Sequence, residues 1–401
     1  MKGTIAMKKA FATLLAVCLI GAAVLGYDFG TNNRDFRLKA YAAATEQAAS
    51  SEETAAAPAG IDYEAIFALH QPDEVVMTVG EHEVTWAEYF YYLYRQASSI
   101  ENYLSMMAMY GMSADWNDPA DENGASYLEL TMQSTELTAK TLAGMEGLAK
   151  ENGITLTEED HKLIEEKSAE DYVAACGEDA TREDFEEYLK TIYLPVSLYD
   201  RMNELSLLNQ NSVTALYGEN SELVSDEDAL AYLDQAGYLY ANHILFMTID
   251  PSTREALDEA TVAEKLSQAE ALAKELQAIE DHDELLKVFA ERKQALDEDT
   301  GKTAYPDGYI FQPGTMAAEF EQTAREQEPY QVSEPVLTTY GYHVILTLPL
   351  TPDTVLTSGT TARQEFATLD YADRLDAYIE AQEVVYAEGF QPPVLTDYML
   401  G

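Results

Sequence analysis

The spacing of the apolar residues changes at Gly237, and this change constrains the fold more than any other feature of the sequence. Ahead of it, residues 85–235 carry apolar residues at helical spacing, and several segments begin with the same signal. A Ser or Thr is followed by Asp three residues later at Thr157, Thr181 and Ser225, which is the pattern of a helix N-terminus. These residues therefore predict an all-helical region.

Beyond Gly237 the pattern is mixed. Residues 238–246 (YLYANHILF) form a β-prone run, and a second such run covers 342–348. Between them lie helical patterns over 253–279, 283–296 and 316–327 and a Gly/Pro-punctuated loop over 297–314. Two strands separated by helices and a loop predict a small α+β domain. Helical spacing returns over 361–386, and the tail from Gly389 is expected to be irregular.

Composition limits the size and the partners of the protein. The 401 residues, 47% of them hydrophobic, allow two or three folded units. Asp and Glu number 72 against 24 Lys and Arg, a formal net charge of -48. Such acidity argues against nucleic acid and anionic membrane surfaces as partners for the bulk of the chain. It serves either solubility or the attraction of cationic clients and metal ions near a cell envelope, and composition does not separate these readings.

The basic residues cluster near the N-terminus around an uncharged run. Lys2, Lys8 and Lys9 precede residues 10–26 (AFATLLAVCLIGAAVLG), as in a secretory signal or an N-terminal membrane anchor. We therefore assign residues 1–27 to a signal or anchor segment and expect an extracytoplasmic protein, anchored to the cell membrane or secreted. A cleaved signal, an uncleaved anchor and a lipoprotein all stay open.

The segment after the apolar run is expected to be a linker. Residues 28–72 are predicted to be flexible, because their central part, residues 42–60, is rich in Ala, Ser, Thr and Glu. Folded structure is expected from Asp73. The chain has two cysteines, Cys18 and Cys176, so the mature part has no internal disulfide and no cysteine cluster of zinc-site spacing. Its folded state then depends on packing.

Three separated segments resemble the signature of the parvulin-type peptidyl-prolyl isomerases. They are Asn242–Leu245 (NHIL), Gly308–Met316 (GYIFQPGTM) with Phe320 and Glu321, and Ser333–Val336 (SEPV) with Gly341–Ile345 (GYHVI). Their order and spacing together carry the resemblance, since each alone is a weak signal. The resemblance implies an FKBP-like α+β domain over residues 236–350. One departure lies at residues 323–330 (TAREQEPY), where the family commonly has an apolar pair and a turn glycine.

The helical regions on either side are similar to the chaperone parts of the PrsA/SurA type of exported foldase. This similarity implies that the parvulin domain is inserted in an all-α chaperone-like domain. That domain would comprise residues 73–235 and be completed by a C-terminal helix and tail over 351–401. The expected fold class is α+β, with an N-terminal membrane segment.

Isomerisation of an X-Pro bond needs no covalent step, and no cofactor or metal is expected. Rotation is slow because amide resonance must be broken, and the uncatalysed step takes about 10–100 s. An enzyme can hold the proline ring in an apolar pocket and favour the twisted amide over either planar form. A dry site that suits the altered charge of the twisted amide lowers the barrier further.

The resemblance maps these roles onto particular residues. The substrate-binding residues that it implies are Phe311, Met316 and Phe320, the last two expected on one helix face. The catalytic residues that it implies are His243, Asp299, Thr338 and His343. The histidines would form a hydrogen-bonded floor, and Asp299 would act electrostatically on the rotating carbonyl. Taken singly, a strand histidine, Met316 or Phe320 reads as a core residue, and Asp299 in its acidic run reads as solvated.

The expected function is therefore a peptidyl-prolyl cis/trans isomerase and chaperone that assists exported proteins outside the cytoplasmic membrane. Its expected partners are unfolded or partly folded exported proteins with X-Pro bonds, and the membrane through the N-terminal segment, but not nucleic acid. Two alternatives stay open. One is a holdase that keeps the parvulin fold without turnover, and the other is a non-catalytic structural surface protein.

Overall fold

The computed structural model describes residues 60–109, 115–120 and 124–400. The predicted signal or anchor segment, residues 1–27, and most of the predicted linker lie outside the described residues. Within the described part of the chain, no helix has both the length and the apolar character that a membrane crossing requires.

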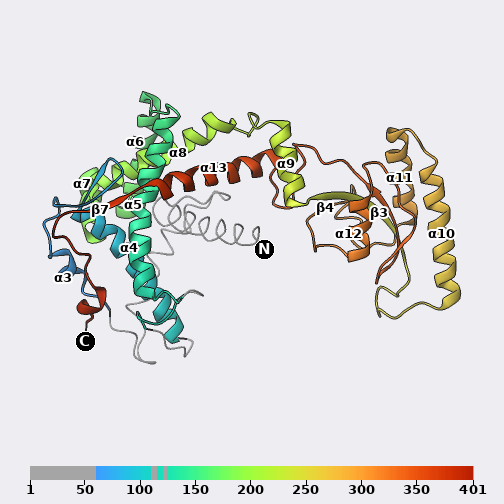
Figure 1. The fold of residues 1–401 in the computed structure, drawn as a ribbon, viewed down its shortest axis with the longest axis horizontal. Coiled ribbons are helices and arrows are strands. Elements are labelled where there is room, and N and C mark those ends of the chain that lie inside the picture. The colour runs from blue at the N-terminus through green and yellow to red at the C-terminus, as the bar shows by residue number, and fades with distance from the viewer. Residues whose placement is uncertain (1–59, 110–114, 121–123, 401) are drawn as a thin grey trace. The chain divides into compact units, whose positions relative to one another are not determined.

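The protein is a mixed α+β structure, mostly helical, with two compact units (Figure 1). The first unit comprises the chain up to Leu216 and from Asp370 onward, and the second comprises Tyr217–Leu369. The second unit is thus an insertion in the sequence of the first. It is wider than the predicted span of 236–350, because α9 (Asp226–Ala236) contributes to its core.

The helices of the first unit are α3 (Tyr63–Phe67), α4 (Trp86–Met109), α5 (Tyr127–Glu151), α6 (Glu158–Cys176), α7 (Arg182–Thr191), and most of α8 (Val196–Tyr217) and α13 (Ala362–Ala381). The predicted helix starts are confirmed. Thr157 and Thr181 each form a complete capping box with the Asp three residues later, and Ser225 caps α9 of the second unit. Each cap stabilises its helix by about 1 kcal/mol.

The prediction that this unit is all-α is wrong. β1 (Val75–Val79) pairs antiparallel with both β2 (His82–Thr85) and β7 (Val384–Tyr386), in the order β2-β1-β7. The predicted C-terminal helix ends at Ala381, and the residues expected to finish it form β7 instead. The partner of β7 lies at the other end of the folded chain, so local periodicity does not reveal the pairing.

The predicted linker also extends too far. The chain is folded from Ile61, which is buried, and Asp62 caps α3, whose Ile66 is fully buried. The N–H of Asp62 donates to the carbonyl of Tyr398 at 2.8 Å, in the short 3₁₀ helix η1 (Leu395–Tyr398). The first described residues and the C-terminal tail therefore order each other.

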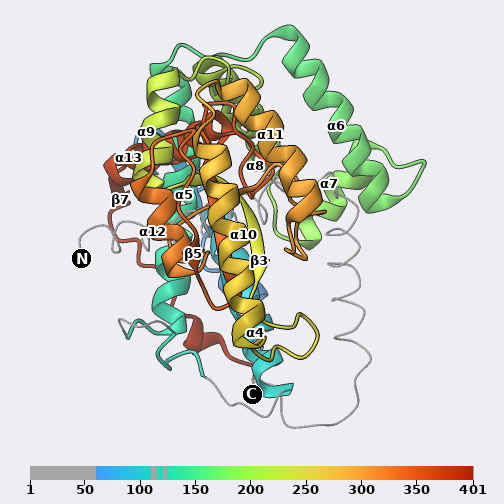
Figure 2. The ribbon, with the colours of Figure 1, turned by 90° about the vertical axis from the view of Figure 1, so that its right-hand side faces the viewer.

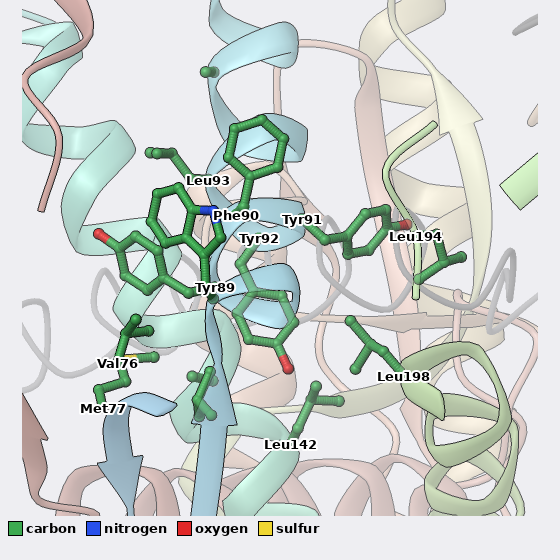
Figure 3. Close-up of a cluster of buried hydrophobic side chains, with 14 of the residues drawn as sticks. Val76, Met77, Tyr89, Phe90, Tyr91, Tyr92, Leu93, Leu142, Leu194 and Leu198 are labelled. Carbon is green, nitrogen blue, oxygen red and sulfur yellow. The ribbon is translucent and has the colours of Figure 1, made fainter. Parts of the chain in front are cut away.

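Helix α4 lies at the centre of the core of the first unit. Its consecutive residues Tyr89–Leu93 are all buried, as is Trp86. Successive residues of a helix point in different directions, so burial of a whole run means that neighbours surround the helix. Figure 3 shows these side chains directed outward from α4, with Val76 of β1, Leu142 of α5 and Leu198 of α8 around them.

The second unit is built on a four-stranded antiparallel sheet of order β4-β3-β6-β5. Its elements after α9 are β3 (Leu239–Met247), α10 (Glu259–Gln277), α11 (His282–Leu296), β4 (Tyr309–Phe311), α12 (Ala318–Glu326), β5 (Val336–Leu337) and β6 (Gly341–Thr347). Helix α12 lies on one side of the sheet and α10 and α11 on the other (Figure 1), and Figure 2 shows α10 beside α11.

Side chains that alternate along the two central strands enter two separate cores. Ile244 and Val344 belong to a buried cluster with α10 and α11, whereas Ala241 and Ile345 pack with Phe320 of α12. Both faces of β3 and β6 are covered, which explains why apolar residues occur on both faces of these strands. The same alternation directs the odd-numbered residues of both strands toward α12.

The packing of α13 on α5 can be tested at a glycine. A Cβ at Gly144 of α5 would lie 2.9 Å from Cγ1 of Ile379 on α13. Ala is favoured over Gly in an open helix by about 1 kcal/mol, whereas overpacking costs about 1–3 kcal/mol. We expect Gly144→Ala to lower the free energy of unfolding of the first unit by about 1 kcal/mol. In an Ile379→Ala background the same change should raise it by about 1 kcal/mol.

Urea unfolding followed by tryptophan fluorescence measures this effect. Both tryptophans of the chain, Trp86 and Trp116, are buried in the core of the first unit, so the signal reports on that unit. Ile379→Ala alone supplies the reference for the double variant. If Gly144→Ala changed the free energy of unfolding equally in both backgrounds, the close packing of Gly144 against Ile379 would be contradicted.

Candidate active site

Strands β3 and β6 bring the two predicted histidines together. In the register of the sheet, His243 lies opposite Ile345 and His343 lies opposite Leu245, so the histidines are diagonal neighbours on the α12 face. Their Nδ1 atoms are 2.9 Å apart, and their ring centroids are 5.0 Å apart. Both side chains are buried.

A chain of hydrogen bonds runs through the two rings. Nε2 of His243 lies 3.2 Å from Oδ2 of Asp299, and the hydroxyl of Tyr309 donates to the same oxygen at 2.7 Å. At the other end, Oγ1 of Thr338 lies 2.8 Å from Nε2 of His343. The chain therefore runs from Tyr309 through Asp299, His243 and His343 to Thr338.

The charge of Asp299 determines the direction of this chain. The hydrogen bond from His243, with those from the Gly301 N–H and from Tyr309, holds the pKa of the Asp299 carboxyl far below its usual range. An ionised carboxylate only accepts, so Nε2 of His243 donates to it. When both rings are neutral, Nδ1 of His243 accepts from His343, and Nε2 of His343 accepts from the hydroxyl of Thr338. Burial, and then the nearby His243, lower the pKa of His343 to about 3, which keeps this ring neutral.

A cavity of about 230 Å³ adjoins the hydrogen-bonded chain. Its lining residues are His243, Leu245, Met247, Asp299, Thr300, Tyr309, Met316, Ala317, Phe320, Tyr340 and His343. Phe320 stands edge-on to both imidazoles, with ring centroids 5.4 Å and 5.5 Å away. Asp299 is the only carboxylate among the lining residues. The cavity thus combines an apolar wall, an imidazole floor and one negative charge.

The structure brings most of the sequence-predicted site residues to this cavity. His243, His343, Asp299, Met316 and Phe320 line it, and Thr338 lies outside the lining but is bonded to His343. Phe311 is the exception, because it packs against Phe320 at a centroid distance of 6.0 Å within the core beneath α12. Phe311 is thus not among the residues that line the cavity, and it supports the wall from behind Phe320.

Met316 reaches the cavity from outside the helix. The expectation that Met316 and Phe320 share a helix face is wrong, because α12 begins at Ala318 and its N-cap is Ala317. The alanine offers no side-chain cap. Instead, the N–H of Gly314 donates to Oε2 of Glu321 at 2.8 Å, which ties the turn before Met316 to the helix.

The acidic run 297–299 is bonded to the sheet, and Asp299 is half-buried rather than solvated as it reads when taken singly. Oδ1 of Asp297 accepts from the N–H of Leu245 at 2.9 Å, and Oε2 of Glu298 accepts from the N–H of Met247 at 2.7 Å. Because β4 pairs with β3 only over residues 239–241, these two carboxylates take the place of a strand along the rest of that edge. This attachment carries Asp299 to the cavity.

Tyr309 is the functional candidate that sequence reasoning missed. It lies two residues before Phe311 in the short strand β4, so period-two alternation directs both side chains to the same face. That alternation was the available signal. Burial, and then the carboxylate of Asp299, raise the pKa of the Tyr309 hydroxyl, so it stays a hydrogen-bond donor.

The arrangement suits binding and charge stabilisation. Among residues 60–109, 115–120 and 124–400, no group of three or more His, Cys, Asp or Glu side chains is placed to hold a metal ion. The hydroxyl of Thr338 is committed to His343, and the single described cysteine, Cys176, is exposed in the first unit.

Comparison with known proteins finds a family model that matches the part of the chain that carries this site. Residues 243–348 match the rotamase family model, the PPIC-type PPIASE domain. The chain is 48% identical over 59 residues to foldase protein PrsA 3 of Bacillus anthracis, which covers 14% of this chain and 20% of that protein. It is 32% identical over 123 residues to foldase protein PrsA of Halalkalibacterium halodurans, which covers 31% of each.

The chain thus aligns with between a fifth and a third of the length of these two relatives. The crystal structure of the peptidylprolyl isomerase PrsA from Bacillus cereus is similar at 19% identity and a TM-score of 0.24, over 67% of this chain and 87% of that one. Residues 243–348 therefore form a PPIC-type domain of the parvulin family of peptidyl-prolyl isomerases, in a chain whose homologues include the PrsA foldases.

Proposed function

We propose that the protein catalyses cis/trans isomerisation of X-Pro bonds and acts as a chaperone for exported proteins outside the cytoplasmic membrane. The observation that carries the isomerase activity is the cavity, in which Met316 and Phe320 stand beside the paired histidines and the Asp299 carboxylate. The chaperone role is supported by relatives that are named foldase proteins. The extracytoplasmic setting is supported by the basic N-terminus and the uncharged run over residues 10–26.

The apolar side of the cavity would bind the proline ring. Met316 and Phe320 offer a flexible thioether and an aromatic ring, which can close around a small saturated ring without hydrogen bonds. The imidazole floor is rigid because the ring nitrogens of His243 and His343 are hydrogen-bonded to each other, to Asp299 and to Thr338. A fixed floor lets the substrate carbonyl rotate while the ring is held.

Asp299 would act on the rotating carbonyl. In the planar amide, resonance places negative charge on the carbonyl oxygen, and this charge decreases as the bond twists. A nearby carboxylate therefore repels the planar ground state more than the twisted transition state, which lowers the barrier. The depressed pKa of Asp299 keeps its charge in place without any proton transfer.

The first prediction concerns the apolar wall. Met316→Ala should lower kcat/KM for a prolyl peptide about tenfold, because truncating an apolar contact removes about 1–3 kcal/mol of binding energy. Met106→Ala, at a 46% exposed methionine of the first unit, is the matched control and should have no effect. A protease-coupled peptide assay measures both. Wild-type protein that matches the uncatalysed rate, yet suppresses aggregation of an unfolded client, would establish the holdase alternative instead.

A second prediction separates charge from shape. Asp299→Asn should lower kcat about tenfold and lower KM as well, because the carboxylate is proposed to repel the bound planar amide more than the twisted transition state. Asp307→Asn removes an equal charge from the exposed end of the same loop, outside the cavity lining, and should leave both constants unchanged. A raised KM with an unchanged kcat for Asp299→Asn would show that the carboxylate serves ground-state binding.

The neutral state of His343 gives a prediction about pH. With a pKa of about 3, its imidazole signal should not titrate between pH 8 and pH 5 in NMR spectra of histidine-labelled protein. The unfolded state binds a proton near pH 6.5, so the domain should lose stability as the pH falls from about 6.5 toward 3. His343→Asn identifies the signal by its loss. A titration midpoint above pH 5 for that signal would contradict the proposed donor-to-acceptor direction of the hydrogen bonds between Asp299 and Thr338.

A further inference from the structure

Lys293 of α11 is a buried lysine that the proposed mechanism does not use. Its side chain is 5% exposed. Burial lowers the pKa of its ammonium group, and attraction by Asp297, Asp299 and Asp307 opposes that shift. A buried ammonium costs several kcal/mol unless its protons are satisfied, so its presence calls for a physical reason.

The ammonium group of Lys293 donates hydrogen bonds to two segments of the domain. Nζ donates to Oδ1 of Asn242 at 2.7 Å and to the carbonyl oxygens of Tyr305 and Pro306 at 3.0 Å and 3.2 Å. Oδ1 of Asn242 also accepts the N–H of His243 at 2.8 Å. One ammonium therefore joins the strand at the first histidine to the loop just before Tyr309.

The loop held by Lys293 carries one wall of the cavity. Asp299, Thr300 and Tyr309 all line the cavity, whereas Lys293 itself does not. The beginning of the loop is fixed to β3 by the carboxylates of Asp297 and Glu298. Its end, before β4 begins at Tyr309, is fixed by the bonds to Lys293. Lys293 therefore contacts the cavity only indirectly, through this loop and through Asn242 beside His243.

We propose that Lys293 is a positioning residue that holds Asp299 and Tyr309 against His243, an inference that rests on the proposed isomerase function. Tyr309 and His243 share one oxygen of Asp299, at 2.7 Å and 3.2 Å, so a shift of the loop changes both contacts together. A misplacement of about 1 Å in a preorganised site can cost up to about a hundredfold in rate.

The test is a double-mutant cycle on kcat. Lys293→Met keeps the length of the side chain and removes its charge and donors, and it should lower kcat at least tenfold, within the range expected for a misplaced group. In an Asp299→Asn background the same change should cost less than about threefold, because the charge to be positioned is gone. Equal losses in the two backgrounds would overturn the proposal, since a general loss of structure acts regardless of Asp299.

Lys287→Met is the matched control on the same helix. Lys287 has a 64% exposed side chain paired with Glu284, and its removal should leave kcat unchanged. Lys293→Gln keeps hydrogen-bond donors at the same site and should retain more activity than Lys293→Met. If Lys293→Met does not fold, Lys293→Gln takes its place in the double-mutant cycle.

A second readout does not depend on catalysis. Amide hydrogen exchange should become at least tenfold faster in residues 299–308 of Lys293→Met, with β3 and β6 still protected. Unchanged exchange in the loop would overturn the positioning role, whether or not the wild-type protein is active. Absence of turnover in wild-type protein, with the exchange change present, would instead remove the proposed isomerase function and leave the structural role of Lys293.

Discussion

The antiparallel pairing of β3 with β6 determines where every other part of the site lies. The register runs from Ala241 opposite Thr347 to Met247 opposite Gly341. A slip by one residue would turn His243 to the face covered by α10 and α11, because side chains alternate along a strand. Gly341 secures the end of this register. Its φ is +151°, and a Cβ there would lie 2.2 Å from the carbonyl oxygen of Phe246.

The two faces of this sheet have different physical tasks. The α10 and α11 face is packed with apolar side chains and supplies stability through burial. The α12 face contains a cavity and several buried polar side chains, which are costly unless each has a partner. His243, His343 and Thr338 meet this requirement through one another. Lys293 of α11, on the other side of the sheet, meets it through Asn242 and the loop. Because each of these polar groups is bonded to a particular partner, the hydrogen bonds fix the positions of the site's side chains.

How much could be predicted from the sequence depends on how far apart along the chain the interacting residues lie. Helix starts at Thr157 and Thr181 depend on atoms three residues apart and were predictable. The histidine pair was predictable from family spacing and strand alternation. The pairing of β7 with β1 and the folding of α3 onto the tail depend on contacts between the ends of the chain, which no local pattern reports. Met316 lies outside the helix because α12 begins two residues later than expected, and Phe311 of β4 packs in the core beneath that helix.

The departure from the family pattern at residues 323–330 lies away from the cavity. Tyr330, where the family commonly has a turn glycine, adopts a φ of +68°, a conformation that costs a side-chain-bearing residue about 1–3 kcal/mol. Its ring stacks on His282 at a centroid distance of 4.0 Å, and its N–H donates to the carbonyl of Thr347 at 2.7 Å, which offsets part of that cost. Helix α12 still buries Phe320 and Ala324 despite its polar C-terminal half. The departure therefore alters the turn that follows the helix and leaves the walls of the cavity in place.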